Sequence, residues 1–195
     1  TLSVLLDSAK EYVVFDAGGG FYKLDRYIKE NKPIIVLLSH FHLDHIIGLH
    51  ALAKFKFAQG IKIFGPKGIK KLFNIIINAP YSMPVNKLKM KLEVNEFSNN
   101  LKLPVNIEYR KLRHVGACYG YRVSAENKSV VFCTDTGPCG NLDLLAKGAD
   151  VLIAESSLPA GKIDNHWPHL NPQQAALLAK QAKVKQLFLV HFDAC

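Results

Sequence analysis

The sequence has no long apolar run, few cysteines and no leader-like start. Its uninterrupted apolar stretches, such as residues 34–38, stop far short of the ~20 residues that cross a bilayer. No basic segment followed by an apolar one opens the chain, so we expect no secretory signal. The first residue is Thr1 and not Met, so we expect a trimmed start.

The cysteines are too few and too irregularly spaced for a disulfide framework or a zinc knuckle. They are Cys118, Cys133, Cys139 and Cys195. A reducing cytoplasm is therefore the expected setting, and nothing in the sequence indicates a membrane as partner.

The composition is that of a globular chain with a basic surface. The 195 residues are 49% apolar and 21% charged, which fits one folded domain. Lysine and arginine total 25 against 16 acids, giving a formal charge of +9. Such a balance favours an anionic partner, RNA or a nucleotide. A solvated basic surface without a partner accounts for the charge equally well.

Apolar runs alternate with amphipathic stretches, the pattern of a layered α/β or α+β domain. We predict strands at 12–15, 34–38, 61–64, 105–109, 120–123, 130–133, 151–154 and 187–190. We predict helices at 21–29, 45–55, 66–77, 142–146 and 172–182. Residues 78–104 are the least regular. They divide a single expected domain, 1–195, into halves of about 1–95 and 105–195.

Several predicted strands run into residues that bind metals. The strand at 34–38 leads to His40, His42, Asp44 and His45, and later strands lead to the donors His114, Asp135 and His191. Side chains from different strands can converge where strands end. These donors suit Zn²⁺, with Mn²⁺ or Fe²⁺ as alternatives. The competing interpretation of the first motif is a histidine-rich surface loop.

The motif His40-Phe41-His42-Leu43-Asp44-His45 resembles the signature of the metallo-β-lactamase-fold hydrolases. Phe15-Asp16-Ala17-Gly18 before it and the three later donors agree in order. The resemblance implies an α/β (α+β) fold, the four-layer αββα sandwich. It also implies two zinc ions, one held by His40, His42 and His114 and the other by Asp44, His45 and His191, with Asp135 bridging.

Within that family the chain is most similar to the ribonuclease Z-like phosphodiesterases. The likeness rests on the stretch that begins His169-Leu170-Asn171-Pro172 and on Val190-His191-Phe192. Ribonuclease Z enzymes carry a long tRNA-gripping arm between the third histidine and the bridging aspartate. Here only 20 residues separate His114 from Asp135, so we expect a smaller or less selective phosphodiester substrate than tRNA.

These residues predict a hydrolase in which a metal-activated hydroxide attacks phosphorus. Asp44 would help to orient the hydroxide, and His169 is the candidate general acid for the leaving oxygen. Glu155 could orient His169, or it is an ordinary buried acid. Asp16 is expected to orient a ligand histidine from behind, or to cap its turn. Thr136 is expected to hydrogen-bond near Asp135.

Other functions remain open on the sequence. An acyl hydrolase of the same fold, acting on β-lactams, lactones or thioesters, is the alternative to a phosphodiesterase or ribonuclease. Trp167 and Tyr81 could stack a base, although loop aromatics usually just pack. A metal-binding or nucleic-acid-binding module without activity fits poorly, because the ligand set is more than binding requires. A homodimer is an open alternative for the assembly of the chain.

Overall fold

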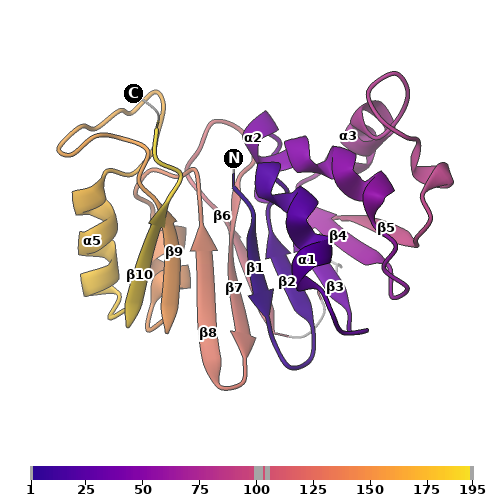
Figure 1. The fold of residues 1–195 in the computed structure, drawn as a ribbon. Helices are drawn as coiled ribbons and strands as arrows, with labels where there is room; N and C mark the ends of the chain where they lie inside the picture. The colour runs from indigo at the N-terminus through magenta and orange to yellow at the C-terminus, as the bar shows by residue number, and fades with distance from the viewer. Residues whose placement is uncertain (1, 99–102, 104–105, 194–195) are drawn as a thin grey trace. The chain divides into compact units, whose positions relative to one another are not determined.

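The structure is a computed structural model, and it describes residues 2–98, 103 and 106–193. The chain forms two compact units, Thr1–Leu101 and Lys102–Cys195. Each unit contains one five-stranded sheet with its helices, as the ribbon shows (Figure 1). Among the described residues, no helix combines the length and apolar content that a membrane span requires.

The sheet of the first unit has the order β1-β2-β3-β4-β5, in which only β1 is antiparallel to its neighbour. Its strands are β1 (Val4–Asp7), β2 (Tyr12–Phe15), β3 (Ile34–Leu37), β4 (Ile61–Gly65) and β5 (Leu92–Glu96). The α-helices are α1 (Leu24–Tyr27), α2 (Leu43–Ile46) and α3 (Ile69–Ile76), and the 3-10 helices are η1 (Gly19–Lys23), η2 (Ile47–Lys54) and η3 (Val85–Lys87).

The core of the first unit lies between this sheet and its helices. Val14, Val36 and Ile63 come from successive strands, point to one face because side chains alternate along a strand, and join one buried cluster. The rings of Phe21 and Phe55 complete the cluster edge to face, with centroids 5.6 Å apart. Parallel pairing of β2, β3 and β4 then brings their carboxyl ends to the same edge.

A short contact with the chain after β2 interrupts the helix expected at 45–55. The Ala17 N–H donates to the His45 carbonyl and the Gly48 N–H donates to the Ala17 carbonyl, both at 2.8 Å. In a continuous α-helix the Gly48 N–H would bond four residues back. The segment is therefore one turn of α2 followed by η2. Gly48 is required here, because a Cβ on it would lie 2.2 Å from the Gly18 carbonyl oxygen.

The sheet of the second unit has the order β10-β9-β8-β7-β6, antiparallel from β6 to β8 and parallel from β8 to β10. Its strands are β6 (Ile107–Lys111), β7 (Tyr119–Ala125), β8 (Lys128–Cys133), β9 (Val151–Glu155) and β10 (Gln186–Val190). Its helices α4 (Gly140–Ala146) and α5 (Pro172–Gln181) pack their apolar sides on Val131, Leu152 and Ala154.

Helix α5 begins as its sequence predicts. The Asn171 side chain accepts from the Gln174 N–H at 2.9 Å, and the Gln174 side chain accepts from the Asn171 N–H at 3.1 Å. This reciprocal capping box satisfies two backbone donors, and Pro172 needs none in the first turn. The start of α5 therefore has a fixed position only three residues after His169.

The predicted strands are confirmed to within two residues at each end, apart from 105–109, whose first residue lies outside the described residues. Two strands were not predicted. β1 lies near the start of the chain, and β5 lies within residues 78–104, where the prediction of irregular structure is wrong for 92–96. Residues 99–100 of that segment are not among the described residues. Helix 21–29 is shorter than predicted and begins as η1.

We predict that Asp150 makes the second unit sensitive to acid. The ammonium of Lys185, 2.7 Å from the carboxylate, and the Ser129 N–H lower the pKa of Asp150 to about 2. A depressed folded-state pKa contributes stability above the unfolded value near 3.9 that is lost as the pH falls toward 2. Asp150→Asn should therefore lower the melting temperature at pH 7 and flatten its decline between pH 4 and pH 2.

Lys185→Gln serves as the companion variant, because it removes the largest cause of the shift and should flatten the same part of the curve. Melting curves over this pH range test both variants. A decline as steep as in the unsubstituted protein would show that Asp150 is not the group responsible.

Candidate functional site

The histidine motif of the first unit forms a tight turn at the carboxyl end of β3. His42 has extended backbone angles, φ −63° and ψ 146°, and α2 begins at the next residue. The ring of His40 lies 4.4 Å from that of His42 and 4.3 Å from that of His45, measured between centroids. Three imidazoles are thus gathered within six residues.

Asp16 fixes this turn from the end of the neighbouring strand β2. Its buried carboxylate accepts three hydrogen bonds, from the Ser39 N–H at 2.7 Å, the Ser39 hydroxyl at 2.8 Å and His45 Nδ1 at 2.7 Å. With its proton on Nδ1, the His45 ring presents Nε2 as the electron-pair donor. That Nε2 lies 3.0 Å from Asp44 Oδ2, so two ligand atoms face the same place.

Ser39 likewise determines which ring nitrogen of His40 carries the proton. The Ser39 hydroxyl has a single proton, which it donates to Asp16, so at 3.0 Å it accepts the Nδ1 proton of His40. The lone pair of His40 is then on Nε2. Sequence analysis did not single out Ser39. Its position between a buried strand and the histidine motif is the one signal that could have identified it.

In the second unit the candidate ligands surround Asp135, which follows β8. The Thr134 hydroxyl donates to Asp135 Oδ1 at 2.6 Å. His191 Nε2 lies 3.4 Å from Oδ1, and His114 Nε2 lies 4.0 Å from Oδ2. One ligand atom each from Asp135, His169 and His191 lies within 4.8 Å of the others. The hydroxyl that donates to Asp135 is that of Thr134.

His169 is held by Glu155, the last residue of β9. The fully buried carboxylate of Glu155 accepts from His169 Nδ1 at 2.7 Å and from the Thr136 N–H at 2.6 Å through Oε1, and from the Ser157 N–H at 3.1 Å through Oε2. The His169 ring, 4% exposed, is nearly parallel to that of His191 with centroids 5.9 Å apart. This contact makes Glu155 more than an isolated buried acid.

Three of these residues have left-handed backbone conformations although they carry side chains. The φ angles are 56° for Asp16, 44° for Asp135 and 54° for His191. Each residue follows the end of a strand, where such a φ turns the chain sharply and aims the side chain along the edge of the sheet. The conformation costs on the order of 1 kcal/mol or more, and it concentrates at functional sites.

Among the remaining candidates, Thr136 and Trp167 contact residues of the second unit's cluster. His50 is exposed and bonded to the Ile47 carbonyl, and His166 is exposed. The Thr136 hydroxyl donates to the Gly137 carbonyl at 2.8 Å. Trp167 lies with its ring centroid 5.8 Å from that of His114. Burial raises the pKa of the Cys133 thiol, and Cys195 lies beyond the described residues.

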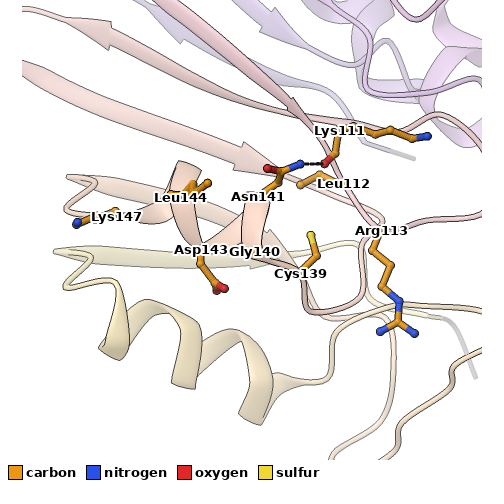
Figure 2. A pocket seen from close by; sticks show the side chains of 9 residues that line it. All are labelled: Lys111, Leu112, Arg113, Cys139, Gly140, Asn141, Asp143, Leu144 and Lys147. Carbon is orange, nitrogen blue, oxygen red and sulfur yellow. Dashed lines mark hydrogen bonds between the residues drawn. The ribbon is translucent and has the colours of Figure 1, made fainter.

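A hollow of about 790 Å³ lies beside α4 in the second unit (Figure 2). Its lining includes Arg113, Cys139 and Asp143 but none of the candidate ligands. Figure 2 shows the side chains of Lys111 and Lys147 pointing in opposite directions, so the hollow does not gather its positive charges. It is therefore not the candidate site.

The donor sets fit a transition-metal ion. Neutral imidazoles with a lone pair on Nε2, together with carboxylates, are the ligands that Zn²⁺, Mn²⁺ and Fe²⁺ accept. The carboxylate behind His45 and the hydroxyl beside His40 set the ring nitrogens as ligand histidines require.

The chain belongs to the beta-lactamase superfamily, whose domain model matches residues 11–192. This is the class of the metallo-β-lactamase-fold hydrolases. Ribonuclease Z of Ligilactobacillus salivarius is 29% identical, with 97% of this chain and 79% of that enzyme covered. Ribonuclease Z of Picrophilus torridus is 28% identical, with 93% of this chain and 76% of that enzyme covered.

Solved structures agree on the fold. The metallo-beta-lactamase fold protein YhfI from Bacillus subtilis aligns with a TM-score of 0.82 and 24% identity, covering 100% of this chain and 79% of that one. The short form of human tRNase Z aligns with a TM-score of 0.78 and 22% sequence identity. The alignment covers 98% of this chain and 85% of that one. The expected fold class, α/β of the metallo-β-lactamase type, and the resemblance to ribonuclease Z are confirmed.

We predict that Asp16→Asn destabilises the first unit. The Asp16 carboxylate accepts three hydrogen bonds on its two oxygens. The amide of Asn has only one oxygen, and its NH2 group cannot accept. At least one buried donor therefore loses its partner. The expected loss in the free energy of unfolding is about 2–3 kcal/mol. Asp25→Asn, at an exposed residue paired with Lys54, is the control and should cost far less stability. Urea denaturation decides, and equal losses would contradict the role of Asp16.

Proposed function

We propose that the chain is a metal-dependent hydrolase of phosphodiester bonds, acting on RNA or on smaller nucleotides. The observation that carries the proposal is the Glu155–His169 pair beside Asp135 and His191. An oriented imidazole next to metal ligands can give a proton to a leaving alkoxide, which phosphodiester cleavage needs. The ribonuclease Z relatives and the charge of +9 support the same substrate class.

The proposal keeps residues 1–195 as one domain and takes its metal ligands from the resemblance to the metallo-β-lactamase-fold hydrolases. His40, His42 and His114 would hold one ion, Asp44, His45 and His191 a second, and Asp135 would bridge them. Bound Zn²⁺, or Mn²⁺ or Fe²⁺ in its place, supplies a nucleophile from water and neutralises charge on phosphate oxygens.

The chain's own residues complete the chemistry. The carboxylate of Asp44, which is partly exposed, can accept a hydrogen bond from the attacking water and orient it. His169 keeps one proton at Nδ1 on Glu155, so its Nε2 proton is the one available to the leaving oxygen. Asp16 keeps His45 in one orientation throughout, which avoids reorganisation during the reaction.

The short connection between His114 and Asp135 supports a substrate smaller than tRNA, or a less selective choice among phosphodiesters. β7 and β8 with their turn occupy most of those 20 residues. The alignment with the Ligilactobacillus salivarius enzyme covers 256 positions, 61 more than the 195 residues of this chain. That enzyme therefore contains segments that have no counterpart here.

A reducing cytoplasm is the proposed setting. The thiols of Cys133 and Cys139 are not in disulfides, as is usual in proteins of that compartment.

A hydrolase of β-lactams, lactones or thioesters is the second candidate, favoured by the match to the beta-lactamase superfamily domain. Acyl transfer has less need of a general acid for its leaving group when that group is already stable as an anion. Parallel assays on single-stranded RNA, a cyclic nucleotide and a chromogenic cephalosporin separate the two. Faster turnover of the cephalosporin would replace the proposed function with the alternative.

We predict that His42→Ala abolishes hydrolysis of a bis-aryl phosphodiester and lowers the bound metal. The loss of one imidazole ligand should reduce kcat/KM by at least about 100-fold. His50→Ala, in an exposed histidine eight residues away, is the matched control and should change neither value. Metal content by elemental analysis is measured alongside activity. Undiminished hydrolysis in His42→Ala would refute the metal mechanism.

We predict that His169→Ala slows esters with poor leaving groups far more than activated aryl esters. A general acid contributes about 10²–10⁴-fold where the leaving oxygen must be protonated, and little where it is stable as an anion. The comparison uses a dinucleotide and a bis-p-nitrophenyl ester, with His166→Ala as the control. Equal slowing of both esters would remove His169 from the role of acid.

A further inference from the structure

A long part of the first unit carries charge of one sign. Between Asp44 and Glu93 the sequence has nine lysines and neither aspartate nor glutamate. All nine side chains are exposed: Lys54, Lys56, Lys62, Lys67, Lys70, Lys71, Lys87, Lys89 and Lys91. Charge of one sign over so long a stretch creates a local positive potential.

Most of these lysines are not neutralised by ion pairs. Lys54 pairs with Asp25 at 2.8 Å, and Lys62 and Lys91 share Glu93 at 3.7 and 2.8 Å. The other six make no ion pair with any residue that the structure describes. Their charges are therefore available to a partner.

Helix α3 carries two of the six lysines, and Lys67 lies two residues before its first residue. Ile69, Phe73 and Ile77 bury one side of the helix in the core, and Lys70, Lys71 and the residues at 74–75 form its exposed side. Glu96 accepts from the Gly68 N–H at 3.0 Å, so the acid nearest the helix start is used by the backbone. Cations in the first turn oppose the helix dipole. Lys70 and Lys71 thus do not serve the stability of α3.

This lysine-bearing helix starts beside the histidine turn. β3 and β4 are parallel neighbours, so the turn after β3 and the start of α3 after β4 lie at the same sheet edge (Figure 1). The contact is close, because a Cβ on Gly68 would lie 3.7 Å from the ring of Phe41. Lys67 precedes Gly68, so positive charge lies next to the candidate ligands of the first unit.

An exposed aromatic ring follows α3. Tyr81 is 71% exposed, and its loop is fixed by the Tyr81 N–H and the Ser82 N–H, which both donate to the Asn78 carbonyl at 2.9 Å. Aromatic rings among basic side chains are the usual means of holding single-stranded nucleic acid, with bases on the ring and phosphates on the cations. The eight residues of α3 extend over about 12 Å, more than one nucleotide.

We propose that this lysine surface, formed by Lys67, Lys70 and Lys71 with Tyr81, binds single-stranded RNA. The phosphates lie along the lysines and one base stacks on Tyr81. The inference rests on the proposed function, since it supplies the strand to the histidine turn. A polynucleotide and not a mononucleotide is then the substrate that the first unit favours.

The test measures binding of a fluorescent, phosphorothioate-linked oligouridylate of about 20 nucleotides by anisotropy at several salt concentrations. Lys67→Gln/Lys70→Gln/Lys71→Gln should weaken binding by about tenfold or more at low salt. It should also reduce the slope of log affinity against log salt by about 2, because each lost phosphate contact on a single strand accounts for about 0.7. Tyr81→Leu should weaken binding by about fivefold and leave the slope unchanged.

The matched control is Lys147→Gln/Lys162→Gln/Lys180→Gln, which removes the same charge from exposed lysines of the second unit. Its affinity should stay within about twofold of the unsubstituted protein. Equal losses in the two triple variants would show that net charge alone attracts RNA, and would overturn the proposal. So would a first triple variant that keeps its RNA affinity and loses binding to phosphatidylserine vesicles.

Hydrolysis of a bis-aryl phosphodiester by the unsubstituted protein is measured separately. Its absence would refute the proposed function, while the binding data would still decide whether the lysine surface holds RNA.

Discussion

Both units fix a histidine with the same interaction, a buried carboxylate at the carboxyl end of a parallel strand. Asp16 after β2 accepts the Ser39 N–H and His45 Nδ1, and Glu155 at the end of β9 accepts the Thr136 N–H and His169 Nδ1. In each case one carboxylate ties the backbone beyond the neighbouring strand to an imidazole. Such acids are costly to bury unless every oxygen is hydrogen-bonded, as these are. The positions of the candidate functional groups depend on them.

The sequence was informative where chemistry and strand pattern coincide. Asp16 and Glu155 were identified because each ends a short apolar run. In the structure each carboxylate is hydrogen-bonded to a histidine ring. Ser39 and Thr134 were missed because a hydroxyl has no signature until its carboxylate is known to lie nearby. The edge strand β5 was missed because its five residues are all only half-buried, so its apolar alternation is weak.

The helix expected at 45–55 failed for a different reason. Its amphipathic pattern is real and its apolar residues are buried, but the backbone of Gly48 bonds to Ala17 and not within a helix. A contact with a residue far back in the chain decided the local conformation, and no local propensity contains that information. The roles of the metal ligands and of His169 stay predictions, although the described geometry of each unit agrees with them.

Acidic and basic side chains of the described residues differ in burial. The buried acids include Asp16, Asp135 and Glu155, whereas no lysine or arginine is buried among the described residues. Burial also keeps the Cys133 thiol protonated, two residues from Asp135. Because the thiolate is the reactive form, peroxides and alkylating agents should spare this sulfur and attack the partly exposed Cys139 first. The polypeptide beside Asp135 is thereby protected from oxidative damage.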